Sequence, residues 1–308
     1  MKEILDYINS VDQLNLDESF QLANKCSRLL RKKDTEVEGR RLIIHILDNW
    51  GKVCKPTRDI WSSLIETAGF YPYIEKESEI KLEDTASRIR REFHKSDHLS
   101  NKYLHEEQKE ILNIINDGKN LIVSAPTSFG KSLLIEEIIA SQSYKNIVII
   151  QPTLALLDET RKKLQKYETS YKLIVRTSQD PSEEKGNIFL LTAERVMEYR
   201  NFPKIEFLIL DEFYKLSAKR DDERSDILNN AFNLLVNKHG CRFYLLGPNI
   251  DGISEGFAEK YNAVFYRTDY SLVDTNIIDY YSKYKDLYGK RGKNKEFKEQ
   301  KLFELLYQ

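Results

Sequence analysis

Two short segments of the 308-residue chain carry the kinds of side chain, at suitable intervals, that bind phosphate groups and catalyse their hydrolysis. The first, "APTSFGKS", follows the apolar run "NLIVS" and places Gly130, Lys131 and Ser132 in succession. Backbone N–H groups in such a loop can face a phosphate, and the following helix adds the positive end of its dipole. Lys131 is suited to the β- and γ-phosphates, and the Ser132 hydroxyl to Mg²⁺. We therefore predict a nucleoside triphosphate site formed by Thr127, Ser128, Phe129, Gly130, Lys131 and Ser132.

This loop departs from the general pattern GxxxxGK[ST] at its first position, where Ala125 stands in place of glycine. A residue at that position only has to fit a turn, and alanine is small. Gly130, in contrast, must let a phosphate approach the backbone closely. Because an apolar strand precedes the loop and a helical pattern follows it, we predict that the loop binds phosphate despite the alanine.

The second segment, "IEFLILDEFYKL", ends an apolar run with the acidic pair Asp211 and Glu212. Asp211 is placed to orient Mg²⁺ through its water shell, and Glu212 to polarise an attacking water molecule. Such a pair is a weak signal alone and a strong one beside a phosphate-binding loop. The predicted catalytic residues are Lys131, Asp211 and Glu212, with Mg²⁺ held by Ser132 and Asp211.

The elements that must position these residues begin near residue 100, where short apolar runs alternate with amphipathic stretches. The runs are "NLIVSA", "NIVIIQP", "KLIVRT", "NIFLLTA", "IEFLILDE", "RFYLLGP" and, last, "NAVFYRT". Buried strands that alternate with helices predict an α/β fold with a parallel sheet covered by helices. Ligands bind to such sheets at the carboxyl ends of the strands, where both chemical segments lie.

Residues 1–98 follow a different pattern, because leucine and isoleucine recur at three- and four-residue spacing with charges between them. This spacing predicts an all-α accessory domain ahead of the α/β part, which we place at residues 99–270. Trp50, Trp61 and the "FYPY" segment could stack on bases, but in a helical domain such aromatics more often form the core.

Composition limits the classes of protein that fit. The net charge of −1 gives no overall attraction to nucleic acid, so such a partner would need a local basic surface. The three cysteines lack CxxC spacing, and His94 and His98 have no third ligand, so we expect no structural zinc and surface or capping roles for these histidines. No signal-peptide pattern is present and no apolar run approaches the roughly 20 residues that span a bilayer. We expect a cytoplasmic protein without a membrane partner.

In order and spacing, six elements between roughly residues 100 and 250 resemble the motifs of superfamily 2 helicases, the DExD/H-box group. "APTSFGKS" is similar to motif I, "DEFY" to motif II, and Gln108 stands in the place of the Q-motif glutamine. "QPTLALLDE", "LTAERV" and "LLGPN" are similar to motifs Ia, Ib and III. The resemblance implies a P-loop, RecA-like lobe that uses ATP and Mg²⁺, with the adenine read by Gln108.

The resemblance also implies that the loops of motifs Ia and Ib contact the phosphates of a single strand, without base specificity. The residues in these positions are Pro152, Thr153, Thr192 and Arg195. Considered without the family, Thr153 and Thr192 could each be a simple helix N-cap.

Two departures from the family pattern affect the coupling between hydrolysis and strand movement. Motif II usually ends in Asp or His, where this chain has Tyr214, and motif III is usually Ser-Ala-Thr. Here the implied coupling residues are Gly247, Pro248 and Asn249, which lack hydroxyl groups, although Asn249 could serve as the hydrogen-bonding member. Both departures resemble the Ski2-like branch and the helicase subunits of the Hachiman antiphage defence system.

A helicase of this type needs two RecA-like lobes, because ATP lies between them and the second supplies an arginine finger. Only residues 250–308 follow Asn249, whereas a second lobe needs on the order of 150 residues. We therefore expect residues 271–308 to be a linker and the start of a truncated second lobe. The chain alone should hydrolyse ATP poorly, because an arginine finger is worth roughly 10³–10⁵ in rate.

The resulting hypothesis is the N-terminal portion of an ATP-dependent helicase or translocase that acts on single-stranded nucleic acid, DNA rather than RNA, in antiphage defence. An RNA helicase is one alternative. The other is a regulatory subunit that binds ATP as a switch and docks an effector protein through the helical domain.

Overall fold

The computed structural model describes residues 1–274 with the exception of residues 77–79, 81, 83–84, 217–222 and 249. The chain divides into two compact units at Leu272, and everything described below lies in Met1–Leu272. The predicted linker and start of a second lobe, residues 271–308, therefore lie almost entirely outside the described residues.

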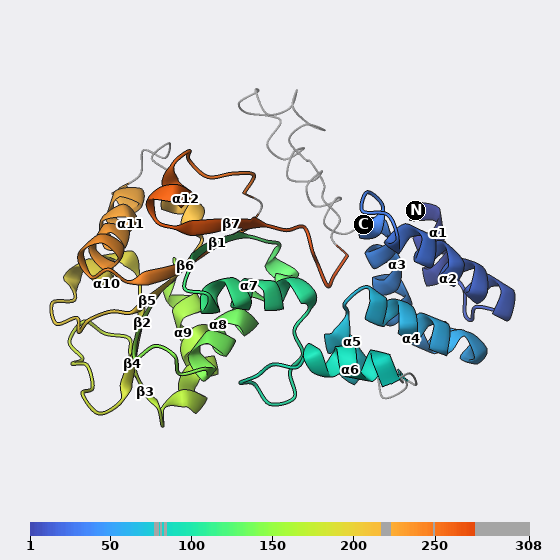
Figure 1. Cartoon of the computed structure of the whole chain (residues 1–308), viewed down its shortest axis with the longest axis horizontal. Helices are drawn as coiled ribbons and strands as arrows, with labels where there is room; N and C mark the ends of the chain where they lie inside the picture. The colour runs from blue at the N-terminus through green and yellow to red at the C-terminus, as the bar shows by residue number, and fades with distance from the viewer. Residues whose placement is uncertain (77–79, 81, 83–84, 217–222, 249, 275–308) are drawn as a thin grey trace, which may run out of the picture. The chain divides into compact units, whose positions relative to one another are not determined.

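The first part of the chain is helical, as its periodicity predicts (Figure 1). Its helices are α1 (Lys2–Ser10), α2 (Leu16–Leu30), α3 (Glu36–Asp48), α4 (Arg58–Thr67), α5 (Tyr71–Lys76) and α6 (Thr85–Phe93), with 3₁₀ turns at Trp50–Lys52 and Lys55–Thr57. Asn15 begins α2 with a capping box: its side chain accepts the Glu18 N–H at 2.9 Å, and the Glu18 carboxylate accepts the Asn15 N–H at 3.0 Å.

Trp50, Trp61, Phe70 and Tyr71 lie in the core of this part, which confirms the core interpretation of these residues over base stacking. Trp61 and Phe70 are completely buried, and Trp50 is 5% exposed. The Trp61 indole N–H donates to Ser19 Oγ at 3.1 Å, so its polar atom is satisfied inside the core.

The α/β part contains a parallel sheet built from the predicted apolar runs. The strands are β1 (Asn120–Ser124), β2 (Asn146–Ile150), β3 (Tyr171–Ile174), β4 (Gly186–Leu191), β5 (Phe207–Asp211), β6 (Arg242–Gly247) and β7 (Ala263–Arg267). Their order is β3-β4-β2-β5-β6-β1-β7, and each neighbouring pair is parallel. Parallel pairing brings the carboxyl ends of β1, β2, β4, β5 and β6 to one edge of the sheet.

Helices cover both faces of this sheet, which confirms the predicted α/β fold (Figure 1). The helices are α7 (Glu106–Asn116), α8 (Lys131–Ala140), α9 (Leu154–Leu164), α10 (Ala193–Glu198), α11 (Glu223–Asn233) and α12 (Phe257–Lys260). Successive strand residues alternate between two cores: Val123 packs with Leu134 of α8, whereas Ile122 packs in the cluster that contains Phe232 of α11. No helix of the described part of the chain is both long and apolar enough to cross a membrane.

The segment between α6 and α7, which links the helical part to the sheet, reverses its direction through an antiparallel bridge between Lys95 and Tyr103, and the segment that follows β7 contacts the helical part again. In that segment Tyr270 is buried, and its hydroxyl lies 3.2 Å from the Gly69 carbonyl oxygen. Leu272 accepts a hydrogen bond from the Tyr73 hydroxyl at 2.9 Å. Because these contacts place both parts in one compact unit, the domain boundary at residue 98 stays a prediction.

Candidate functional site

The phosphate loop runs from the end of β1 to the start of α8. A 3₁₀ turn over Thr127–Phe129 leads to Gly130, whose φ of 85° lies in the left-handed region. A methyl group at Gly130 would lie 2.5 Å from Gln108 Nε2, so glycine is required both for the backbone conformation and for the close approach. The α8 helix begins at Lys131 directly afterwards and directs its free N–H groups at the loop.

Ala125, the unusual first residue of this loop, is buried and has no positive φ. Its N–H donates to the Gly247 carbonyl at 3.0 Å, which continues the hydrogen bonding between β1 and β6. Nothing in this conformation requires glycine, so the structure explains why alanine is tolerated.

Lys131 folds back over its own loop. Its ammonium donates to the carbonyl oxygens of Ala125 at 3.1 Å and Pro126 at 3.3 Å. Burial lowers the pKa of the Lys131 ammonium, while the carboxylates of Asp211 and Glu212 act in the opposite direction. The Lys131 ammonium is therefore close enough to interact electrostatically with both carboxylates.

The acidic pair lies at the carboxyl end of β5. Asp211 Oδ1 accepts the Glu212 N–H at 3.0 Å, and burial raises the pKa of the Asp211 carboxyl against the lowering effect of that bond. Glu212 has a φ of 59°, which is uncommon for a residue with a side chain, and its carboxylate forms an ion pair with Lys215. The left-handed conformation ends the strand abruptly between the two carboxylates.

One cavity of about 280 Å³ joins the phosphate loop to the acidic pair. Residues predicted from the sequence to act together line this cavity, namely Thr127, Gly130, Lys131, Ser132, Asp211, Glu212 and Pro248. The cavity also reveals Gln151, at the end of β2, whose side chain hydrogen-bonds to Asp211 and lowers its pKa. A strand-end position was the signal that could have identified Gln151 from the sequence.

The donors and acceptors of this cavity suit a magnesium-bound triphosphate. The Lys131 ammonium and the amides at the start of α8 match phosphate oxygens, and the Ser132 hydroxyl and Asp211 carboxylate are hard oxygen ligands of the kind Mg²⁺ prefers. No group of three or more His, Cys, Asp or Glu in the described ranges could hold a metal ion by itself.

Gln108 lies beneath the loop and not at an open surface. It is 1% exposed, its Nε2 donates to the Phe129 carbonyl at 2.9 Å, and its Oε1 accepts the His105 N–H at 3.1 Å. His105 Nε2 donates to the same Phe129 carbonyl oxygen at 3.2 Å. The sequence analysis missed His105, although its spacing of three residues from Gln108 is that of a capping box.

The predicted nucleic-acid residues differ in their surroundings. Thr153 is an exposed N-cap of α9, and its hydroxyl accepts the Leu156 N–H at 3.3 Å, so the capping alternative is correct for its geometry. Thr192 occupies the N-cap position of α10 without a side-chain cap bond to any described residue. It lines a second cavity of about 130 Å³ together with Pro152 and Asp211. Arg195 is half-buried and donates to the Val175 carbonyl at 3.0 Å.

The end of β6 lies against the turn that follows the acidic pair. A methyl group at Gly247 would lie 3.1 Å from the Phe213 ring and 2.6 Å from the Ile250 side chain, so glycine permits this contact. The Ile250 N–H donates to Ser124 Oγ at 2.7 Å, which connects the same segment to the end of β1. Asn249, predicted to assist coupling, lies outside the described residues.

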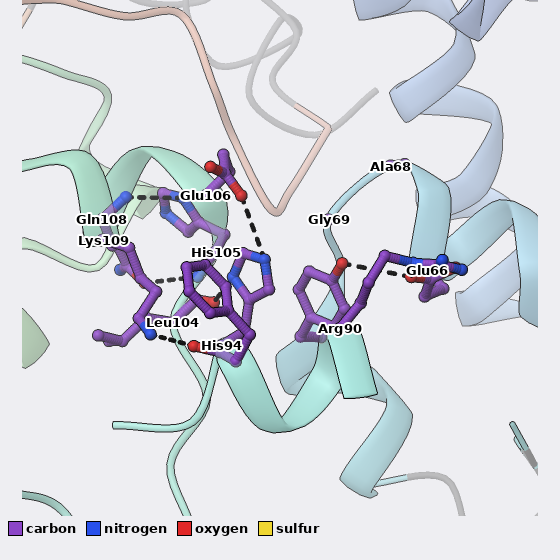
Figure 2. Close-up of polar contacts among 12 residues, drawn as sticks. Glu66, Ala68, Gly69, Arg90, His94, Leu104, His105, Glu106, Gln108 and Lys109 are labelled. Carbon is purple, nitrogen blue, oxygen red and sulfur yellow. Dashed lines mark hydrogen bonds and ion pairs between the residues drawn. The ribbon is translucent and has the colours of Figure 1, made fainter. Parts of the chain in front are cut away.

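The expectation of a surface or capping role for His94 is wrong, because its side chain is buried beside the start of α7 (Figure 2). Its ring stacks on Tyr71 with centroids 4.0 Å apart, and its Nε2 lies 3.1 Å from a Glu106 carboxylate oxygen. His98 remains exposed. The chain reversal between residues 95 and 103, which a helical pattern does not reveal, separates the two.

Two protein families match this chain, each over a separate part. Residues 1–88 match the anti-bacteriophage protein B N-terminal domain, and residues 105–243 match the DEAD/DEAH box helicase family. The second match contains the phosphate loop and the acidic pair. The motif-based resemblance to superfamily 2 is thereby confirmed, while the narrower likeness to Hachiman subunits stays a prediction.

Two individual proteins are also similar to this chain, and their names agree with the two family matches. Anti-bacteriophage protein B of Escherichia coli strain K12 is 30% identical over 268 residues, which are 84% of this chain and 36% of that protein. Putative helicase 7 of Sulfolobus islandicus filamentous virus is 28% identical over 181 residues, which are 54% of this chain and 29% of that protein. The chain thus spans about a third of the length of these relatives.

Among solved structures, the Pyrococcus furiosus Hef helicase domain is similar to this chain, with 11% identity and a TM-score of 0.39. The match covers 59% of this chain and 44% of the Hef chain. That likeness is too loose to support a conclusion, so the assignment depends on the family matches and the sheet itself. Residues 105–243 are thus similar to the DEAD/DEAH box helicases of superfamily 2, and residues 1–88 to the N-terminal domain of anti-bacteriophage protein B.

Proposed function

We propose that this chain supplies the ATP-binding lobe of a nucleic-acid helicase or translocase that acts in defence against bacteriophage. The observation that carries the proposal is the single cavity in which the loop lysine, the loop serine and the acidic pair meet. The defence role is supported by the relative described as anti-bacteriophage protein B, which aligns with 84% of this chain.

In this proposal each residue of the cavity has one chemical task. Gly130 and the first amides of α8 receive phosphate oxygens, and Lys131 neutralises their charge. Ser132 and Asp211 would hold Mg²⁺, which supplies charge neutralisation on the triphosphate. Glu212 accepts a proton from the attacking water. In a helicase of this type, complete turnover also needs a cation from a second lobe.

Single-stranded nucleic acid is the proposed partner, with DNA favoured over RNA. The preference for DNA follows only from the antiphage link. Thr192 and Pro152 support strand binding near the nucleotide site, because they line a cavity together with Asp211. Strand binding there would rely on backbone phosphates and would weaken with salt.

The nucleotide site is tested by Lys131→Ala, with Lys172→Ala as the matched control because Lys172 is an exposed lysine of β3 outside the site. Titration of Mg²⁺-ATP should show at least a tenfold weaker Kd for the first variant, since loss of a charge-assisted bond is worth about 1.5–3 kcal/mol. Equal affinity in both variants would reject the assigned loop.

The partner is tested by binding of fluorescent single-stranded DNA and RNA of the same sequence at two salt concentrations. Thr192→Ala should weaken binding of the preferred strand and leave the affinity for Mg²⁺-ATP unchanged. Tighter binding of RNA would favour the RNA helicase alternative, and no binding of either strand would favour a regulatory subunit.

A further inference from the structure

His105 is the most enclosed titratable residue beside the phosphate loop. It is completely buried, and aromatic rings flank its imidazole on two sides. The Phe129 ring meets it edge-on with centroids 4.7 Å apart, and the Tyr270 ring stacks on it at 4.3 Å. The two rings fix the orientation of the imidazole, because close packing leaves it no space to rotate or move away.

The hydrogen bonds of the imidazole determine which nitrogen carries the proton. His105 Nδ1 accepts the Gln108 backbone N–H at 3.3 Å, in the capping box that begins α7 (Figure 2). A nitrogen that accepts carries no hydrogen, so the neutral ring has its hydrogen on Nε2 and donates it to the Phe129 carbonyl. Burial supports this neutral form by lowering the pKa of His105 to about 3.

The Phe129 carbonyl therefore receives two donors from below, His105 Nε2 at 3.2 Å and Gln108 Nε2 at 2.9 Å. The described peptide bonds are all trans, and in a planar trans peptide the carbonyl and the following N–H point in opposite directions. Fixing the Phe129 carbonyl beneath the loop consequently directs the Gly130 N–H to the other side. Gly130 lines the cavity on that side, so its N–H faces the position of the phosphates.

The same contacts occupy the polar groups of Gln108. A glutamine reads adenine by donating to N7 and accepting from the N6 amino group. Here the amide of Gln108 donates to the loop and accepts from His105, and the side chain is 1% exposed. Gln108 is also absent from the described lining of the cavity that holds Lys131 and the acidic pair.

We propose that His105 and Gln108 are a pair of positioning residues that orient the Phe129–Gly130 peptide for phosphate, and that the site selects nucleotides by the triphosphate and not by the base. The substrate class is then any nucleoside triphosphate with Mg²⁺. This inference rests on the proposed nucleotide site and replaces the expectation that Gln108 reads adenine.

Two variants separate loop support from helix capping. His105→Asn retains an N-cap, because asparagine is a strong capping residue, but its side chain is too short to reach the Phe129 carbonyl. Gln108→Glu retains the acceptor for the His105 N–H, as glutamate does in a standard capping box, and removes the donor to Phe129. Thermal unfolding of both variants measures whether the fold survives.

The experiment is a titration of the chain and its variants with ATP, GTP, CTP and UTP, each with Mg²⁺. Wild type should bind all four within about threefold of one another, and each variant should weaken all four by a similar factor of about five to ten, the value of one hydrogen bond. Because the wild-type comparison needs no variant, it decides the question of base selection even if a variant unfolds.

A wild-type preference for ATP of about a hundredfold, or a variant that loses ATP while keeping the other three, would overturn the proposal in favour of adenine reading by Gln108. If both folded variants bind all four nucleotides as wild type does, the pair does not position the loop. A wild-type chain that binds none of the four would instead refute the nucleotide site itself, and the inference with it.

Discussion

The two halves of the candidate site are held in place by different forces. Buried, uncharged groups support the phosphate loop: His105 and Gln108 hold the Phe129 carbonyl, and the Ala125 N–H pairs with Gly247. The acidic turn is instead held by a left-handed Glu212 and by its ion pair with the partly exposed Lys215. Binding of phosphate thus depends on packing, and the placement of the acid depends on charge and backbone strain.

Because different forces hold the two halves, nucleotide binding and hydrolysis should be separable by mutation. A loop supported by buried hydrogen bonds is ready for its ligand before the ligand arrives. A carboxylate on a strained turn, paired with a flexible lysine, can change its position at little cost. Each prediction below affects one half and spares the other.

The largest effect should come from Glu212→Gln. Hydrolysis should fall by about 10²–10⁴, the usual contribution of a general base, while the Kd for Mg²⁺-ATP changes by no more than about twofold. Single-turnover hydrolysis by the full-length protein with single-stranded DNA present measures the first quantity, and titration measures the second. Glu168→Gln, an exposed carboxylate elsewhere in the same lobe, is the control. Loss of ATP binding in Glu212→Gln would show that the two halves are not separable.

Gly130→Ala should have the converse effect, a loss of nucleotide affinity of about a hundredfold. The matched control is Gly118→Ala, because Gly118 has a φ of 84° and no atom within 4 Å of the added methyl, whereas Gly130 has a φ of 85° and Gln108 at 2.5 Å. Both substitutions cost roughly 1–2 kcal/mol of backbone strain. Only Gly130→Ala should displace Gln108 and weaken ATP binding, and equal binding in the two would contradict the close packing beneath the loop.

The buried histidine should make stability depend on pH. Because the folded pKa of His105, about 3, lies below the ordinary value of 6.5, the unfolded chain binds a proton in that interval and the folded chain does not. The free energy of unfolding should therefore fall as pH drops below about 6.5, by up to about 1.4 kcal/mol per pH unit.

Urea unfolding at pH 7.5, 6.5 and 5.5 measures this slope, which should be shallower in His105→Asn and unchanged when the exposed His98 is replaced by Asn. Some slope should remain in His105→Asn, because burial also lowers the pKa of His94. A slope as steep as in wild type would mean that His105 is not kept neutral by the fold.

The smallest effect should come from Lys215→Ala, which removes the ion pair to Glu212. Both partners are about one-third exposed, so solvent screens the pair and the free energy of unfolding should change by less than about 1 kcal/mol. Urea unfolding checks this value, and a loss above about 2 kcal/mol would show that the acidic turn is as firmly held as the phosphate loop.

Much of the fold could be predicted, because a strand that is buried on both faces appears in the sequence as a continuous run of apolar residues. Each predicted run is a strand, and the loop residues Gly130, Lys131 and Ser132 lie where the strand–loop–helix pattern requires. The strand order does not follow from the runs, since they contain no information about which strands are neighbours.

The sequence could not reveal properties that depend on which distant segments come together in the folded chain. The role of His105 depends on α7 reaching the underside of a loop more than twenty positions later, and Gln108 is occupied for the same reason. The left-handed φ of Glu212 is equally hidden, because glutamate has no preference for that conformation. Thr153 and Thr192 look alike in sequence, yet only Thr153 makes a cap bond within the described residues.

Gly247, at the end of β6, lets two loops of the candidate site pack directly against each other. Because no side chain separates Gly247 from the Phe213 ring, the turn after Glu212 and the segment before Ile250 are in steric contact, and Ile250 is in turn hydrogen-bonded to Ser124 at the root of the phosphate loop. A residue with a side chain at position 247 would therefore displace the Phe213 ring or the Ile250 side chain. We expect any coupling between the acidic turn and the phosphate loop to pass through this steric contact, where a segment with hydroxyl groups could use hydrogen bonds.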